Sequence, residues 1–351
     1  MEPDSPEGLS AAEPVAVPWH QLKTDELLKM RLCDLPLRIQ GSEIEPQVWQ
    51  LYAQLDARGV PIKPGCYLGD EWFSPNGSPA IAVPFYLAHP RLKELEMVQM
   101  LEVAGDDPDS CQRLLRHECG HALDHAFKLN QREDYQAVFG NHDEDYNPET
   151  YTPKPYSKSY VLNLPNWYGQ SHPDEDFAET FAVWLTDLPE VWRERYKGWN
   201  ALYKLEYVDR LMQELAGKKP LVRKVRRRFD ASKSRKTLAR HYAERRKLFA
   251  EDFPDFYDHD LRTIFGRGPA GEESAAKFMR RYRAALIASL VEWTGQRKYT
   301  VTELVTKLTK RCASLKLPAP RDAVRLQFEV GAYLASLVTT HLYTGKFKRI
   351  L

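Results

Sequence analysis

The feature that most constrains the fold of this chain is the run His117-Glu118-Cys119-Gly120-His121, an HExxH pattern. Two histidines four residues apart project from one face of an α-helix, so their imidazoles can converge on a single Zn2+ at about 2.0 to 2.1 Å. Glu118 then lies beside the metal, where its carboxylate can take a proton from water activated by the ion and pass it to a leaving amine. The pattern therefore predicts a helix that carries a hydrolytic metal site.

The surrounding sequence supports a helix at this position. Asp107 followed by Pro108 makes a good N-cap and first helical residue, and apolar residues recur at helical spacing as far as Leu129. We expect one helix from Pro108 to Leu129, with HExxH in its middle. The alternative is a pair of core histidines satisfied by hydrogen bonds, but Glu118 between them favours the zinc site.

A catalytic zinc usually takes three protein ligands and keeps one position for water, so a second element has to supply another donor. Residues 171–187, SHPDEDFAETFAVWLTD, predict a helix capped by Ser171, with Pro173 in its first turn and an apolar stripe at helical spacing. Glu175 and Glu179 share a different face. We expect Glu175 to be the third ligand and Glu179 to orient a ligand histidine through its second ring nitrogen. Solvated acids on a surface helix are the alternative.

These residues resemble the gluzincin-type zinc peptidases, in which HExxH is followed by a glutamate ligand on a later helix. The runs SHPDEDFAETFA at 171–182 and PFYLAHPRL at 84–92 are similar to a bacterial family of putative zinc-binding metallopeptidases, and the catalytic segment also resembles that of anthrax lethal factor. The resemblance covers about residues 30–190. It implies a zincin-like fold in which His117, His121 and Glu175 bind zinc and Glu118 is the general base.

The resemblance also gives a role to Tyr168, which stands seven residues before Glu175. In lethal factor the tyrosine at that spacing donates its hydroxyl to the developing oxyanion, a role that fits the need for donors aimed where charge appears in the transition state. Without the resemblance, Tyr168 is better explained as loop packing, because tyrosine is amphipathic. With it, the catalytic role is favoured.

Three more residues of the predicted HExxH helix can be ligands or structural groups. His125 continues the four-residue series, but a straight helix cannot easily bring three successive turns to one ion, so we expect a supporting or surface role for His125 and Asp124. Cys119 is a soft donor, yet a free cysteine is most often a small core residue. We expect Cys119 to pack in the core.

Composition predicts a globular protein, because 351 residues with 43% hydrophobic content can bury a sizeable core in two structural units. Five cysteines at irregular positions form neither a disulfide framework nor a zinc ribbon, which favours a reducing compartment. The N-terminus has neither the basic start nor the apolar core of a signal peptide, and no apolar run is long enough to span a membrane. We expect a cytoplasmic protein without a membrane partner, with a flexible tail at residues 1–22.

Residues 23–217 are expected to form the catalytic domain, with helical segments at 24–30 and 46–59 and a strand at 35–39. Extended segments at 66–73 and 80–87 are expected around an Asn-Gly turn. In zincins an edge strand near the metal binds the substrate backbone through main-chain hydrogen bonds. Residues 80–87 fit that role and the role of an ordinary core strand equally well.

Between the two motif helices, residues 130–168 are polar, aromatic and rich in proline, and we expect a long loop that walls or gates the cleft. Asp143, Glu144 and Asp145 in this loop can bind a cation, but a surface acidic turn explains them better. A further helical stretch follows at 189–216 and is closed by Gly217.

Residues 218–351 are expected to hold a basic segment and a helical bundle, with helices at 273–293, 300–315 and 321–343. Residues 218–247 carry fourteen Lys or Arg against two acids, a local charge near +12 in a chain whose formal charge is +1. Such a segment can contact nucleic acid or another polyanion. We favour solvated helix faces that pair with acids elsewhere, because aromatic residues are sparse in it.

The sequence thus predicts a mainly α, α+β chain in which a zincin-like metallopeptidase domain is followed by an α-helical region. The expected function is zinc-dependent hydrolysis of peptide bonds in a protein or peptide. The alternative is a zinc-stabilised, non-catalytic interaction protein that binds nucleic acid or another polyanion through residues 218–247. Intact Glu118 argues against that alternative.

Overall fold

The computed structural model describes residues 17–143, 154, 156–248, 257–267 and 269–344. Most elements are helices and only four short strands occur among these residues, in agreement with the predicted mainly α, α+β class. Glu144 and Asp145, two of the three acids considered for a cation, lie outside the described residues, as does the predicted tail up to residue 16. Trp19 and Leu22, predicted to belong to that tail, pack against the first hydrophobic core instead.

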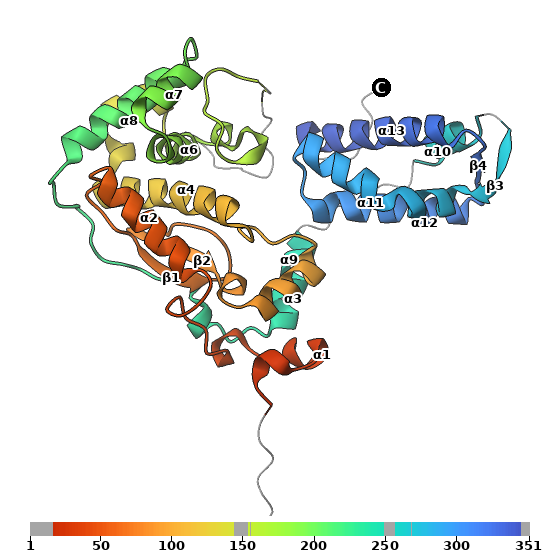
Figure 1. Ribbon diagram of the computed structural model, residues 1–351, viewed down its shortest axis with the longest axis horizontal. Coiled ribbons are helices and arrows are strands. Elements are labelled where there is room, and N and C mark those ends of the chain that lie inside the picture. Colours follow the sequence, from red (N-terminus) through yellow and green to blue (C-terminus); the bar gives the residue numbers. More distant parts are fainter. Residues whose placement is uncertain (1–16, 144–153, 155, 249–256, 268, 345–351) are drawn as a thin grey trace, which may run out of the picture.

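The first part of the chain contains a small two-stranded sheet, and most of its other elements are helices (Figure 1). Its elements in chain order are η1 Trp19–Gln21, α1 Thr24–Leu27, η2 Leu32–Asp34, α2 Glu45–Ala57, β1 Gly65–Gly69, β2 Ala80–Pro84, η3 Phe85–Ala88, α3 Pro90–Met100, α4 Pro108–Phe127, η4 Leu129–Gln131, α5 Glu133–Phe139, η5 Pro165–Gln170, α6 Pro173–Thr186, α7 Pro189–Arg195, α8 Ala201–Leu215, η6 Ala231–Lys233 and α9 Leu238–Leu248.

The HExxH helix, α4, begins as predicted. The Asp107 side chain accepts a hydrogen bond from Ser110 N at 2.9 Å and so caps the first turn, where Pro108 has no amide hydrogen to satisfy. The helix ends at Phe127, because Lys128 adopts a left-handed conformation with φ 54°. The predicted end at Leu129 was therefore two residues too late.

The start of α6 differs from the prediction. His172 is the N-cap, and its Nδ1 accepts a hydrogen bond from Asp174 N at 3.1 Å. Ser171 is not the cap, because its backbone is still in the right-handed helical region at the end of η5 and its hydroxyl donates to Tyr168 O at 2.7 Å. The rest of the predicted helix is present as Pro173–Thr186.

Helices α4 and α6 pack closely against each other (Figure 1). Gly120, inside the HExxH pattern, makes this approach possible, because a Cβ built on it would lie only 2.8 Å from Ala178 Cα. A backbone atom at that distance cannot move aside as a flexible side chain can. The small residue therefore lets α6 bring its acidic face next to the two histidines.

Strands β1 and β2 are parallel, with Tyr67 opposite Ala82 in the register. All five residues of β2 are buried. Ala82 also exchanges backbone hydrogen bonds with Phe73 on its other side. The structure therefore favours a core strand over a substrate-binding edge.

Two predicted strands were too long, since β1 ends at Gly69 and β2 at Pro84. The third predicted strand is absent, because residues 35–39 form no strand.

The predicted loop at 130–168 contains a helix that the sequence analysis missed, α5. Tyr135 and Phe139 of α5 are buried, and their rings pack against Phe177 of α6 at centroid distances of 5.2 and 5.5 Å. Tertiary packing of two aromatic residues thus stabilises a seven-residue helix that would be marginal in isolation.

The last part of the chain forms the predicted helical bundle, which lies beside the first part in Figure 1. Its elements are α10 Asp258–Phe265, β3 Ala270–Ser274, α11 Ala275–Thr294, α12 Lys298–Ser314, β4 Pro318–Pro320 and α13 Ala323–Thr344. Leu286, Ile287 and Leu290 of α11 are buried in this bundle, and Ala285 is exposed.

The hydrophobic residues form two large separate cores, one drawn from residues 27–242 and one from residues 257–338. Leu238 and Tyr242 belong to the first core, although the sequence analysis grouped 218–351 together. We therefore propose that the division between the two structural units follows Leu248 rather than Gly217.

Candidate metal centre

Three predicted ligands lie together between α4 and α6. One donor atom from each of His117, His121 and Glu175 lies within 4.8 Å of the other two. His117 Nε2 is 3.0 Å from Glu175 Oε2, and His121 Nε2 is 3.2 Å from the same oxygen. The two Nε2 atoms are 3.2 Å apart. The i, i+4 spacing on α4 and the first turn of α6 produce this arrangement.

The spacing of these atoms fits a tetrahedral zinc ion. Bonds of about 2.0 to 2.1 Å at tetrahedral angles separate neighbouring ligand atoms by about 3.3 Å. Two imidazole nitrogens at 3.2 Å cannot both face each other as bare acceptors, so a proton or a cation has to lie between them. The donor set of two imidazoles and one carboxylate is also one that zinc accepts.

The electrostatics of the three residues favour positive charge at this point. Burial by itself would lower the pKa of His117, but hydrogen bonds to Glu175 and Glu179 raise it well above its usual value. Burial would raise the pKa of Glu175, but the charge of His121 and hydrogen bonds from both histidines hold it well below its usual range. The protein therefore stabilises a cation here, which a bound metal ion would supply in place of protons.

Glu179 lies one turn after Glu175 and contacts the other nitrogen of His117. Glu179 Oε1 is 2.8 Å from His117 Nδ1, and both atoms are buried. A carboxylate at Nδ1 fixes the tautomer with the proton on that nitrogen and leaves Nε2 free to bind a metal. Glu179 therefore contacts His117 rather than His121, and its role in orienting that histidine stays a prediction.

Glu179 makes two further hydrogen bonds that the sequence analysis missed. Its Oε1 accepts from Asn163 Nδ2 at 2.8 Å, and its Oε2 accepts from Leu164 N at 2.7 Å. These donors belong to the segment that leads into η5, which carries Tyr168. No local pattern marks Asn163, because an asparagine in a polar loop has many equivalent explanations.

Glu118 is only 6% exposed, and it is close enough to His117, His121 and Glu175 for their charges to act on its carboxyl group. Burial raises the pKa of its carboxyl above the usual value, while the charges of His117 and His121 oppose that shift. A carboxylate whose pKa is raised toward neutrality is a better proton acceptor.

Tyr168 lies on η5 and is partly buried. Its ring centroid is 5.6 Å from that of His117, with the two planes tilted by 54°. The tyrosine ring therefore lies next to that of His117, and its catalytic role stays a prediction.

Three other residues of α4 do not join the ligand group. His125 Nδ1 lies 3.4 Å from Ser74 Oγ, and burial lowers the pKa of this histidine to about 4. Asp124 is buried and its Oδ1 accepts from Asn130 N at 2.8 Å, so it fixes the turn after α4. Cys119 is fully buried in the first core. Among the described residues, the three-residue metal group contains none of them.

The chain is thus of the mainly α, α+β class, and two of its packed helices bring together two histidines and a glutamate that can hold a metal ion. Residues 113–216 match a family model described as "Putative zinc-binding metallo-peptidase", which confirms the resemblance to that family for this part of the chain, while residues 84–92 lie outside the matched range. The match begins within α4, runs through α8 and includes all three donors. No curated protein and no solved structure matches the chain. No described helix has the length and apolar character needed to cross a bilayer.

Proposed function

We propose that this chain is a zinc-dependent peptidase that hydrolyses peptide bonds in a protein or peptide by attack of water. The observation that carries the proposal is the convergence of His117, His121 and Glu175 on one point, with the buried Glu118 beside it. The family match supports metallopeptidase chemistry at a coarser level.

In this proposal the Nε2 atoms of His117 and His121 and a carboxylate oxygen of Glu175 hold the zinc ion. The ion supplies Lewis acidity, which polarises the scissile carbonyl and lowers the pKa of water to about 7. Glu118 accepts a proton from the attacking water on its carboxylate and delivers it to the nitrogen of the leaving amine. Its raised pKa suits both transfers, because the same group has to accept a proton and release it.

Two further side chains complete the proposed site. The Tyr168 hydroxyl donates to the oxygen of the carbonyl as negative charge develops there, and its ring position beside His117 supports this role. Glu179 holds His117 in the tautomer and orientation that zinc binding needs.

The experiment measures bound zinc and cleavage of a mixed peptide library by the wild-type chain and by Glu118→Gln. We expect both proteins to hold zinc and only the wild type to cleave. Cleavage by Glu118→Gln at the wild-type rate would contradict the role of Glu118. A zinc-loaded wild type that cleaves no peptide would favour the alternative of a non-catalytic interaction protein.

A further inference from the structure

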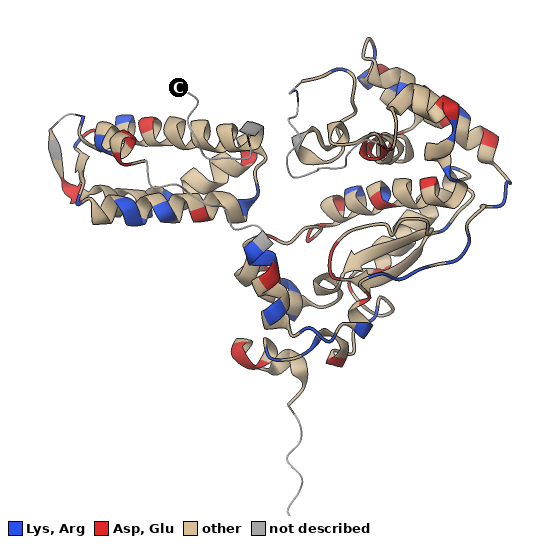
Figure 2. Ribbon diagram, turned by 180° about the vertical axis from the view of Figure 1, so that it is seen from behind, with Lys and Arg blue, Asp and Glu red and all other residues tan. Residues whose placement is uncertain are grey.

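The basic run that follows α8 is not a helix face. Residues 218–229 form neither helix nor strand and cross from the end of α8 toward η6, along one edge of the first unit (Figure 2). Their backbone is held in place at three points. Val222 N donates to Ala126 O at 2.9 Å, Arg226 N donates to Ser78 Oγ at 2.8 Å, and the Tyr67 hydroxyl donates to Arg228 O at 2.8 Å. The segment is therefore a fixed part of the surface.

Most cations of this segment have no acidic partner among the described residues. Lys218 pairs with Glu214, and farther along Lys236 and Arg240 pair with Glu244. Between these pairs stand eight exposed cations that form no ion pair within the described part of the chain: Lys219, Arg223, Lys224, Arg226, Arg227, Arg228, Lys233 and Arg235. We call these eight residues the basic strip. The explanation favoured from the sequence, helix faces neutralised by acids, does not apply to them.

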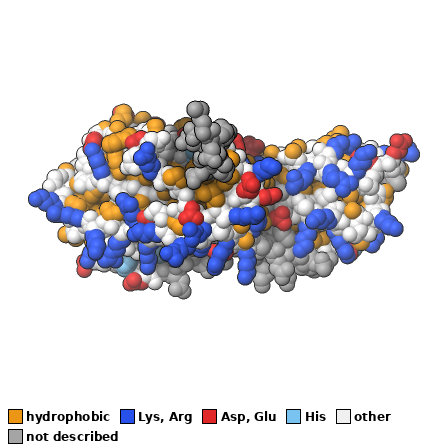
Figure 3. Space-filling view, turned by 90° about the horizontal axis from the view of Figure 1, so that it is seen from below, with side chains coloured by type: hydrophobic (Ala, Val, Ile, Leu, Met, Phe, Trp, Pro, Cys, Tyr) orange, Lys and Arg blue, Asp and Glu red, His pale blue; other side chains and the backbone are white. Residues whose placement is uncertain are grey.

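The strip contributes to a strongly cationic face of the molecule. Lys and Arg side chains outnumber Asp and Glu on the face seen from below (Figure 3). Like charges held close together on a fixed backbone repel one another and attract a polyanion. Five of the eight residues are arginines, whose planar guanidinium groups bind phosphate through two parallel hydrogen bonds.

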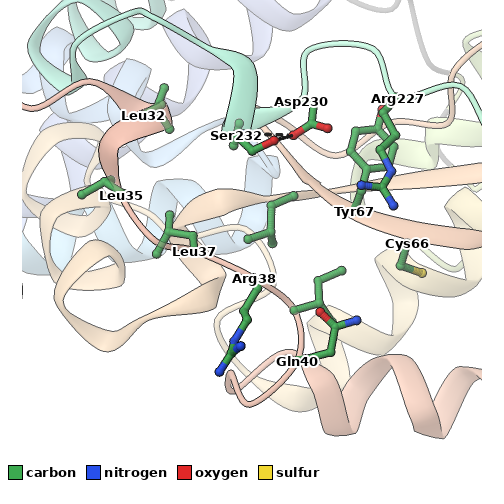
Figure 4. A pocket seen from close by; sticks show the side chains of 13 residues that line it. Leu32, Leu35, Leu37, Arg38, Gln40, Cys66, Tyr67, Arg227, Asp230 and Ser232 are labelled. Atoms are coloured by element: carbon green, nitrogen blue, oxygen red, sulfur yellow. Dashed lines mark hydrogen bonds between the residues drawn. The ribbon is translucent and has the colours of Figure 1, made fainter.

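A small pocket opens beside the strip (Figure 4). Its lining includes Arg227 and also Arg38, which is exposed and forms no ion pair with any described residue. The Arg227 guanidinium carbon lies 6.0 Å from the centre of the Tyr67 ring, and Leu37 and Leu68 add apolar surface. The volume is about 150 Å³, below the range of roughly 300 to 1,000 Å³ typical of small-molecule sites. The pocket therefore suits one group of a longer ligand better than a complete small molecule.

We propose that the basic strip binds the phosphate backbone of a single-stranded nucleic acid. Phe229 follows three consecutive arginines and is 68% exposed, so its ring offers a surface on which a base can stack. A membrane surface fits less well. Val225 packs on Gly65, where an added Cβ would lie 2.9 Å from Val225 Cγ2, and the Phe229 ring meets Phe73 edge to face at 5.8 Å. Val225 and Phe229 remain 42% and 68% exposed, but residues 218–229 form no helix, so they lack the continuous apolar face that an amphipathic helix lays into lipid.

The strength of binding follows from counterion release. For a single strand, the logarithm of the binding constant falls with the logarithm of salt by about 0.7 for each phosphate neutralised. Removing three cations therefore reduces this slope by about 2, which corresponds to about 100-fold weaker binding near 0.1 M salt.

The test measures fluorescence anisotropy of a labelled single-stranded oligonucleotide of mixed sequence, titrated with the full-length chain over a series of salt concentrations. One variant carries Arg226→Gln, Arg227→Gln and Arg228→Gln, and a second carries Lys219→Gln, Arg223→Gln and Lys224→Gln. The control carries Lys277→Gln, Arg280→Gln and Lys310→Gln, which removes three exposed charges from the C-terminal bundle. Thermal unfolding of each protein checks that the fold is retained.

We expect both strip variants to bind about 100-fold more weakly near 0.1 M salt with a reduced salt slope, and the control to bind like the wild type. Equal losses in the control and the strip variants would overturn the proposed location. Absence of salt-dependent binding by the wild type would overturn the proposal itself. Binding only to phosphatidylserine vesicles, or only to polyglutamate, would also overturn it and identify a lipid surface or an acidic polypeptide as the occupant.

Discussion

The position of Glu179 makes the substitution Glu179→Gln the sharpest test of the metal centre. The carboxylate accepts three hydrogen bonds of 2.7 to 2.8 Å, from His117 Nδ1, Asn163 Nδ2 and Leu164 N. A glutamine has only one acceptor oxygen, so its amide group must face at least one of these donors with a donor of its own. If the oxygen stays with His117, the amide faces Leu164 N, and the remaining hydrogen bonds lose the assistance of the negative charge.

Two magnitudes follow from this geometry. One buried donor left without an acceptor costs about 1–3 kcal/mol in the free energy of unfolding of the metal-free protein. Loss of the carboxylate that orients a ligand histidine weakens zinc binding by about 10- to 100-fold. The first quantity is measured by urea unfolding, and the second by competition for zinc with a chromophoric chelator.

Glu194→Gln is the matched control, because it makes the same chemical change on a side chain that is 80% exposed and that pairs, among the residues the structure describes, only with Lys197, at 3.6 Å. We expect the control to change neither quantity measurably. Wild-type zinc affinity in Glu179→Gln, with an unchanged circular dichroism spectrum, would refute the idea that His117 depends on Glu179 for its orientation.

Three other outcomes are expected. Gly120→Ala should lower the free energy of unfolding by about 1–3 kcal/mol, since its Cβ would meet Ala178 Cα at 2.8 Å, and urea titration measures this loss. Tyr168→Phe should slow peptide cleavage by about 10²- to 10³-fold while zinc affinity in the chelator assay stays unchanged. Burial lowers the pKa of His241 to about 3. Below about pH 6.5, therefore, only the imidazole of the unfolded chain takes up a proton, and this uptake lowers the free energy of unfolding by about 2 kcal/mol between pH 7 and pH 5. His241→Phe, which keeps the ring contact with Phe85, should remove that part of the acid sensitivity, as urea unfolding of the metal-free protein at both pH values will show.

The sequence was informative about the metal centre because its main parts are written in local patterns. The spacing of His117 and His121 requires only the geometry of one helix, and Asp107 with Pro108 marks where that helix begins. Glu175 and Glu179 also share one face of a single helix. Only the meeting of the two helices had to be assumed, and the family resemblance supplied that step.

The parts that the sequence analysis missed depend on contacts between distant segments. Asn163 bonds to a residue sixteen positions later. Helix α5 is fixed by aromatic packing on α6 rather than by its own helical period. For the basic segment, the sequence shows the composition but not the conformation of the backbone. Only the absence of acidic partners in the described chain shows that its charge is not neutralised internally.

Glycine at position 120 illustrates why such long-range requirements escape a local pattern. HExxH leaves its third and fourth positions free, and neither the histidines nor the glutamate require a small residue there. The requirement comes from α6, which must approach closely enough for Glu175 to reach both imidazoles, and Ala178 is the residue that crosses at Gly120. A larger side chain at 120 would leave the pattern intact while separating the helices that carry the three donors. The motif therefore specifies the chemistry of two ligands, whereas the fit between two small residues on different helices decides whether the third can join them.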